Sequence, residues 1–145
     1  MGISNPPTND HCTQRQAIAL NTPVTGNSTA ARPHGLTNTE CSLHPYARGL
    51  FYVVTGTGTS LQLTWTIIDN NDNKDGRFEI AILSQTCFHC VQVSDFLVAD
   101  DSPFTTTFDT EVNVEYVILV SGEGFGDTAA FTLEVQVRVG VGQFF

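Results

Sequence analysis

The chain has 145 residues and a formal net charge of -9, from 15 acidic and 6 basic side chains. This length suits one domain, and an apolar content of 41% with 14% charged residues supports a folded core, which excludes a disordered chain. The absence of clustered lysine and arginine argues against a nucleic-acid partner, and no apolar run approaches the roughly 20 residues that span a bilayer, so we expect no membrane insertion.

Short apolar segments with a period of two predict β-strands along most of the chain. Stretches rich in Gly, Asn, Asp and Thr, such as residues 55–58, 69–76 and 122–126, separate them as turns. In chain order, the predicted strands cover residues 17–20, 24–29, 50–54, 61–67, 77–83, 91–98, 104–109, 115–121 and 131–139.

Two of these strands show the clearest alternation. Leu61, Leu63, Trp65 and Ile67 fall on one face of the first, and the apolar positions from Phe131 to Val139 fall on one face of the second. Eight or nine short strands without a helical pattern between them predict an all-β fold, an antiparallel β-sandwich or barrel.

Four cysteines, Cys12, Cys41, Cys87 and Cys90, favour two disulfides in a secreted protein. The sequon at Asn27 predicts N-glycosylation and agrees with an extracellular location.

Of the three connectivities, we favour Cys12 with Cys41 and Cys87 with Cys90, because the second pair lies in one tight turn. A structural zinc site is the alternative, since Cys87 and Cys90 have the spacing of a zinc knuckle. A thioredoxin-like redox pair is not expected, because the flanks predict strands rather than a helix N-terminus.

Several segments, in order, resemble one bacterial family. They are Asn9-Asp10-His11-Cys12, the apolar residues 17–20, the aromatic strand 50–53, Gly56-Thr57-Gly58, residues 78–83 before the close pair of cysteines, Asp100-Asp101, residues 115–122 and residues 131–135. Together they are similar to the pre-peptidase C-terminal (PPC-like) domains. The resemblance implies a jelly-roll-like β-sandwich that is extracellular, has no catalytic residues and in some members binds calcium or a polymeric substrate.

Oxygen-bearing side chains are densest at Asp69, Asn71, Asn73 and Asp75, ahead of Gly76. Their spacing matches the first half of a calcium loop, but Ile82 stands where an EF-hand requires a bidentate Glu. We therefore predict either a looser calcium site or a polar hairpin turn. Asn9-Asp10 and Asp100-Asp101 are secondary carboxylate sites.

No motif for nucleophilic or metal-dependent hydrolysis occurs in the chain, so we expect no enzyme and no required cofactor, with calcium as the one candidate ligand. A carbohydrate-binding module would use loop aromatics as stacking platforms, and Tyr46, Phe88 and Phe125 are the candidates.

The C-terminal alternation continues beyond a usual strand length, through Val139 and Val141 to Phe144 and Phe145. Such an overhanging strand could add to the sheet edge of a neighbour, which would build an open filament when repeated head to tail. The alternative is that it folds back over its own sandwich.

The sequence thus predicts an N-terminal tail at residues 1–8, a PPC-like β-sandwich at 9–139 and an apolar tail at 140–145. We expect an extracellular structural or adhesion module that acts through self-assembly or through binding to cell-surface or matrix components, including glycans. A carbohydrate- or calcium-binding accessory domain of a secreted hydrolase is the alternative.

Overall fold

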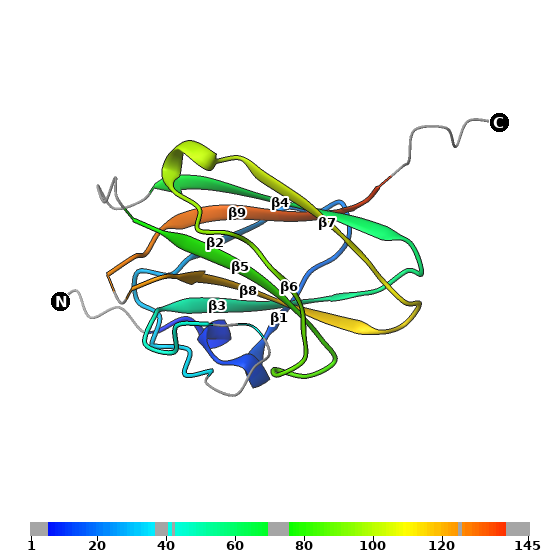
Figure 1. The fold of residues 1–145 in the computed structure, drawn as a ribbon, viewed down its shortest axis with the longest axis horizontal. Coiled ribbons are helices and arrows are strands. Elements are labelled where there is room, and N and C mark those ends of the chain that lie inside the picture. Colours follow the sequence, from blue (N-terminus) through cyan, green and yellow to red (C-terminus); the bar gives the residue numbers. More distant parts are fainter. Residues whose placement is uncertain (1–5, 37–40, 42, 70–75, 125, 139–145) are drawn as a thin grey trace.

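The computed structural model describes residues 6–36, 41, 43–69, 76–124 and 126–138, which form two packed β-sheets (Figure 1). This confirms the predicted antiparallel β-sandwich. The elements of the described residues are η1 (Thr8–Asp10), η2 (Cys12–Gln14), β1 (Gln16–Ala17), β2 (Val24–Asn27), β3 (Gly49–Thr55), β4 (Ser60–Asp69), β5 (Phe78–Ser84), β6 (Cys90–Val93), η3 (Ala99–Asp101), β7 (Phe104–Asp109), β8 (Glu115–Gly122) and β9 (Ala130–Val137).

One sheet has the strand order β1-β3-β8-β5-β6 and the other has the order β2-β9-β4-β7. Neighbouring strands are antiparallel except β1 and β3, which are parallel. The three η elements are single 3-10 turns, and no helix among the described residues is long and apolar enough to cross a membrane.

The main core fills the space between the sheets. Alternation places Leu61, Leu63 and Trp65 of β4 on the inner face, where each is fully buried. They pack with aromatic side chains from both sheets, including Tyr52 of β3 and Phe131 of β9, whose ring centroids are 6.4 Å apart. The predicted inward faces are therefore confirmed at these positions.

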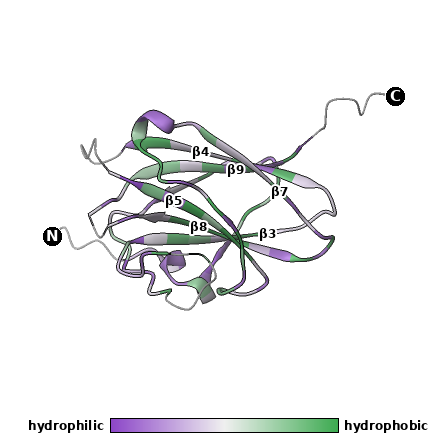
Figure 2. Cartoon of the chain, in the orientation of Figure 1, coloured by the Kyte–Doolittle hydropathy of each residue, from purple (hydrophilic) through white to green (hydrophobic). Residues whose placement is uncertain are grey.

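The outer face of the five-stranded sheet is also covered. Strands β5 and β8 are apolar along nearly their whole length, which predicts burial on both faces (Figure 2). A second cluster of buried residues on this face joins Phe51, Ala81, Leu83, Val117 and Leu119 to Cys12 and Cys41. We call the covering segments, residues 8–15 and the described part of 34–48, the cap.

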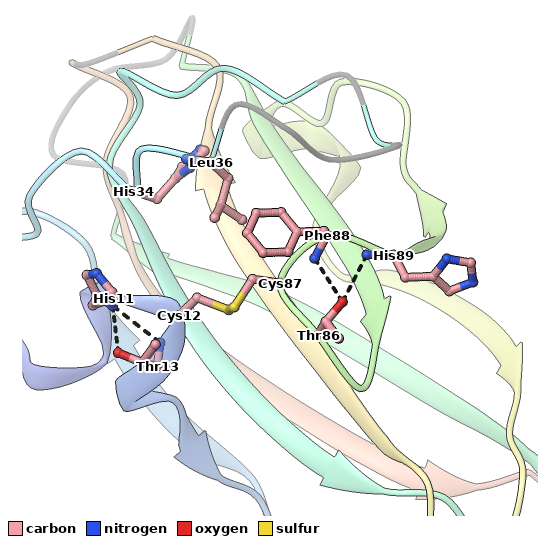
Figure 3. The surroundings of a disulfide bond; sticks show 9 residues. All are labelled: His11, Cys12, Thr13, His34, Leu36, Thr86, Cys87, Phe88 and His89. Atoms are coloured by element: carbon pink, nitrogen blue, oxygen red, sulfur yellow. Dashed lines mark hydrogen bonds between the residues drawn. A yellow bond between two sulfur atoms is a disulfide. The ribbon is translucent and has the colours of Figure 1, made fainter.

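Two disulfides hold the cap on the sheet, and their pairing corrects our prediction. Cys12 is bonded to Cys87, as Figure 3 shows, and Cys41 is bonded to Cys90. Their Cα–Cα distances are 6.2 and 5.3 Å. Cys87 lies in the bend before β6 and Cys90 is the first residue of β6, and each side chain reaches a different cap segment. All four cysteines are oxidised, so the zinc alternative was also wrong.

Candidate recognition site beside the disulfide cap

The predicted calcium ligands are only partly placed by the structure. Asp69 ends β4 and is exposed, whereas Asn71, Asn73 and Asp75 lie outside the described residues. Among the residues that the structure does describe, no group of three His, Cys, Asp or Glu side chains could hold a metal ion. The calcium loop stays a prediction.

The secondary carboxylates have structural roles. Asp10 is buried, and its two oxygens accept hydrogen bonds from the backbone N, Nε and Nη2 of Arg32 at 2.9 to 3.1 Å. Burial alone would raise the pKa of Asp10, but the hydrogen bonds and charge of Arg32 outweigh it and lower that pKa. The Asp101 carboxylate accepts from Val98 N at 2.9 Å and closes a turn, as the polar-turn interpretation requires.

Asn27 is exposed at the end of β2, so its side-chain amide is open to glycosylation. Its Oδ1 accepts from Thr29 N at 2.9 Å. The assembly residues Val139, Val141, Phe144 and Phe145 and the aromatic Phe125 lie outside the described residues.

A site that the sequence analysis missed begins at Glu79 of β5. Glu79 shares the outer face of the sheet with Ala81 and Leu83, because residues two apart on a strand point the same way. Its neighbours on this face are under the cap, and Glu79 lies at the edge of that cover with only 6% of its surface exposed. The sequence signal that could have found this site is the single carboxylate in the otherwise apolar run of β5, because such a run predicts burial.

The segment after β6 forms one wall of the site. Ser94 N donates to Ile80 O, and Ser94 Oγ accepts from Ile80 N, so this segment stays against β5. Phe78 and Leu97 continue the pairing through an isolated bridge. Between these anchors, Asp95 and Phe96 point outward, and Phe96 is 47% exposed.

The cap approaches the same carboxylate through His44. His44 Nε2 lies 3.4 Å from Glu79 Oε1, and the His44 ring centroid lies 6.1 Å from that of Phe96. Arg77 lies over Phe96, with its Cζ 6.0 Å from the ring centroid, and its Nη1 lies 3.7 Å from Glu123 Oε2. Three segments distant in sequence thus meet around one carboxylate.

An open pocket of about 540 Å³ lies at this carboxylate and is lined by Glu79, Val93, Ser94, Asp95 and Phe96. Burial raises the pKa of Glu79, the charge of His44 acts in the opposite direction, and the Glu123 carboxylate raises the pKa further. The pocket lining thus includes two acidic residues, Glu79 and Asp95, and the aromatic residue Phe96.

Exposed apolar side chains are concentrated in two segments, the cap loop and residues 88–96. The described residues include eight large apolar side chains that are exposed. Five of them lie on the cap loop or between the tip of the β5–β6 hairpin and Phe96, and these are Tyr46, Phe88, Val91, Val93 and Phe96. In Figure 3 the ring of Phe88 and the side chain of Leu36 point toward each other beside the Cys12–Cys87 bond. We call these five residues the β6 surface.

A second open pocket of about 470 Å³ lies at the opposite turns, between Thr55, Gln85, Asn113, Val114 and Glu115. Gln85 and Asn113 have φ values of 59° and 63°. Its lining carries one carboxylate and no aromatic ring, so it serves below as a reference site.

Comparison with known proteins gives a likeness of fold. No protein-family model matches the chain, and no curated protein matches it in sequence. One similar solved structure is CorA, described as a surface-associated copper-binding protein important in copper acquisition by Methylomicrobium album BG8. The match covers 88% of this chain and 100% of CorA, with a TM-score of 0.51 and 12% sequence identity. At this identity the likeness concerns the sandwich architecture alone.

Proposed function

We propose that this chain is a non-catalytic extracellular β-sandwich of the PPC-like type that functions by binding other copies of itself. The β6 surface is the observation that carries the proposal. Exposed apolar side chains that lie close together on a soluble domain mark interaction sites, and Val91 and Val93 of this set lie on the edge strand β6.

Strand β6 is a suitable acceptor for an added strand. It is the edge strand of the five-stranded sheet and pairs with β5 alone among the described strands. Edge strands are usually protected by charge, but β6 exposes Val91 and Val93, each 40% accessible. The other edge of the sheet is β1, which has two residues.

The apolar C-terminal residues 139–145 are the proposed donor. Their alternation supplies the period of two that strand addition needs. Because donor and acceptor are different surfaces, the contact is heterologous, and repetition gives an open filament.

The extracellular location is supported by two disulfides, which persist in oxidising compartments. The surface association of CorA is consistent with this location. Disulfide bonding of the cap keeps the β6 surface in one conformation, which lowers the entropy cost of binding.

The test compares the full chain with a chain ending at Arg138 and with the variants Val91→Lys and Val93→Lys. Light scattering and electron microscopy of the full chain should show polymers, and each of the three changes should leave monomers. Val112→Lys is the matched control, since Val112 is 64% exposed and lies outside the β6 surface. A monomeric full chain, or polymers that persist in all three variants, would refute the proposal.

The same samples test the predicted calcium loop at Asp69, Asn71, Asn73 and Asp75. If calcium orders a site that supports assembly, EDTA should lower the polymer fraction and added calcium should restore it. An unchanged mass together with no calcium uptake would remove calcium from the proposal.

A further inference from the structure

The pocket on Glu79 combines features that do not belong to strand addition. Glu79 places a carboxylate in the floor of a cavity of about 540 Å³, and the exposed Asp95 carboxylate lies in its wall. The aromatic face of Phe96 stands at the rim. The addition of an apolar strand to β6 would require none of these groups.

The charges that act on Glu79 are of both signs. His44 is the basic group closest to it, at 3.4 Å, with a side chain that is 42% exposed. Arg77 is directed to Glu123 and to Phe96, and Glu123 adds negative charge near the pocket. A buried carboxylate pays a desolvation penalty that a nearby positive charge offsets.

The Phe96 ring is suited to binding a positively charged group. The guanidinium of Arg77 already lies 6.0 Å from its centroid, which is within the range of cation–π attraction. The net charge of -9 for the whole chain would also attract a cation and speed its encounter with the pocket.

We propose that this pocket binds the guanidinium or ammonium group of an arginine or lysine side chain of a protein partner, with Glu79 and Asp95 as its counter-ions and Phe96 as its stacking face. A carboxylate matches the planar fork of arginine, so arginine is the preferred side chain. A free metal ion is disfavoured as the occupant, because the described part of the chain offers no cluster of three ligands.

The experiment titrates the ¹⁵N-labelled full chain with Nα-acetyl-arginine amide and follows backbone amide shifts. The chain ending at Arg138 replaces it if polymers broaden the spectra. Amides of residues 93–96 and of Glu79 should shift with saturation. Nα-acetyl-citrulline amide, which has nearly the same shape without the charge, should bind at least tenfold more weakly.

The variants separate this site from general attraction to an acidic protein. Glu79→Gln should weaken binding about tenfold, which corresponds to about 1.4 kcal/mol. Asp95→Asn changes an exposed side chain, so it tests the pocket without a risk to folding, and it should weaken binding about threefold. Glu115→Gln, in the reference site, is the matched control and should leave the affinity unchanged.

Three results would overturn the proposal. They are equal binding of the citrulline and arginine probes, an effect of Glu115→Gln equal to that of Glu79→Gln, and saturable shifts at this pocket with methyl glucoside but not with the arginine probe. The last result would identify a sugar site. Because the readout is binding by single subunits, failure here leaves the assembly proposal intact, and loss of assembly leaves this proposal intact.

Discussion

His44 Nε2 lies 3.4 Å from Glu79 Oε1, and this pair connects the cap to the outer face of the five-stranded sheet. Glu79 belongs to β5, whereas His44 belongs to a loop that Cys41 ties to Cys90. The contact therefore joins a covalently fixed loop to a strand, and the pocket lined by Glu79 lies beside this contact. The cap thus has two roles, since it covers apolar sheet residues and also shapes a polar site.

Replacing Glu79 by Gln should stabilise the fold. Burial raises the pKa of Glu79, so the ionised carboxylate is disfavoured in the folded state, and the amide keeps its size without its charge. We expect the free energy of unfolding at pH 7 to rise by up to about 1 kcal/mol, measured by urea denaturation.

Glu115→Gln is the control, since Glu115 is exposed and its replacement should change stability by less than about 0.5 kcal/mol. If Glu79→Gln instead lowered the free energy of unfolding by more than about 1 kcal/mol, the charge itself would be needed to hold the cap.

The disulfide pairing can be established by peptide mapping. Phe88 lies between Cys87 and Cys90, so chymotrypsin acting on the unfolded, unreduced chain separates the two cysteines. Mass spectrometry should then recover peptides that link Cys12 to Cys87 and Cys41 to Cys90. A peptide joining Cys12 directly to Cys41 would show that the pairing described here is incorrect.

The strand predictions succeeded where alternation and turn residues act locally. Residues 104–109 were predicted as a strand and form β7 with those bounds, and the predicted strand 115–121 differs from β8 by one residue. The predicted strand 91–98 is longer than β6, because residues 94–96 are irregular and only isolated hydrogen bonds of Ser94 and Leu97 continue the pairing with β5. Local patterns cannot show where a strand ends when the following residues still pair with a neighbour through isolated bonds.

The disulfides and the pocket could not be predicted because they depend on long-range packing. Cys12 and Cys87 are 75 residues apart, and only the folded sheet brings the hairpin tip under η2. His44 of the cap and Glu79 of β5 are likewise brought together only by the folded structure. The short spacing between Cys87 and Cys90 was a misleading signal, because the chain does bend at residues 85–88, yet each cysteine bonds to a cap cysteine that is distant in sequence.

Gly26 of β2 is required by the packing between the sheets. A Cβ atom at this position would lie 2.7 Å from Phe131 Cζ and would meet the hydroxyl of Tyr52, both in the core. Gly26→Ala should therefore lower the free energy of unfolding by about 1–3 kcal/mol, the usual effect of overpacking.

The control is Gly126→Ala, because no atom lies within 4 Å of a Cβ placed there. Urea denaturation of this variant should match the wild type to within about 0.5 kcal/mol. Equal stability of the two glycine variants would mean that β2 can move away from the core without loss.

His34 should make the fold sensitive to mild acid. It is 6% exposed, and its Nδ1 accepts a hydrogen bond from Leu36 N at 3.1 Å, so the neutral ring carries its proton on Nε2. Burial lowers the pKa of His34 to about 4; the backbone of His44 raises it and the charge of His44 lowers it further. Protonation would place a second proton on Nδ1 and break the bond to Leu36.

The sign of the effect follows from linkage. The unfolded chain takes up this proton near pH 6.5 and the folded chain only near pH 4, so the contribution is fully present above pH 6.5 and is lost as the pH falls toward 4. A difference of this size corresponds to about 3 kcal/mol. Glu79 acts in the opposite direction, because its raised pKa favours the folded state on acidification. The lowered pKa of Asp10 removes stability only below pH 3.8.

Urea denaturation between pH 7 and 4.5 tests this prediction. The wild type should lose stability over this range, and His34→Gln should lose markedly less, whatever its stability at pH 7. His11→Gln is the matched control, since His11 is exposed at the start of η2, and it should keep the wild-type slope. If His34→Gln lost stability as steeply as the wild type, the acid sensitivity would have to come from groups other than the buried imidazole of His34.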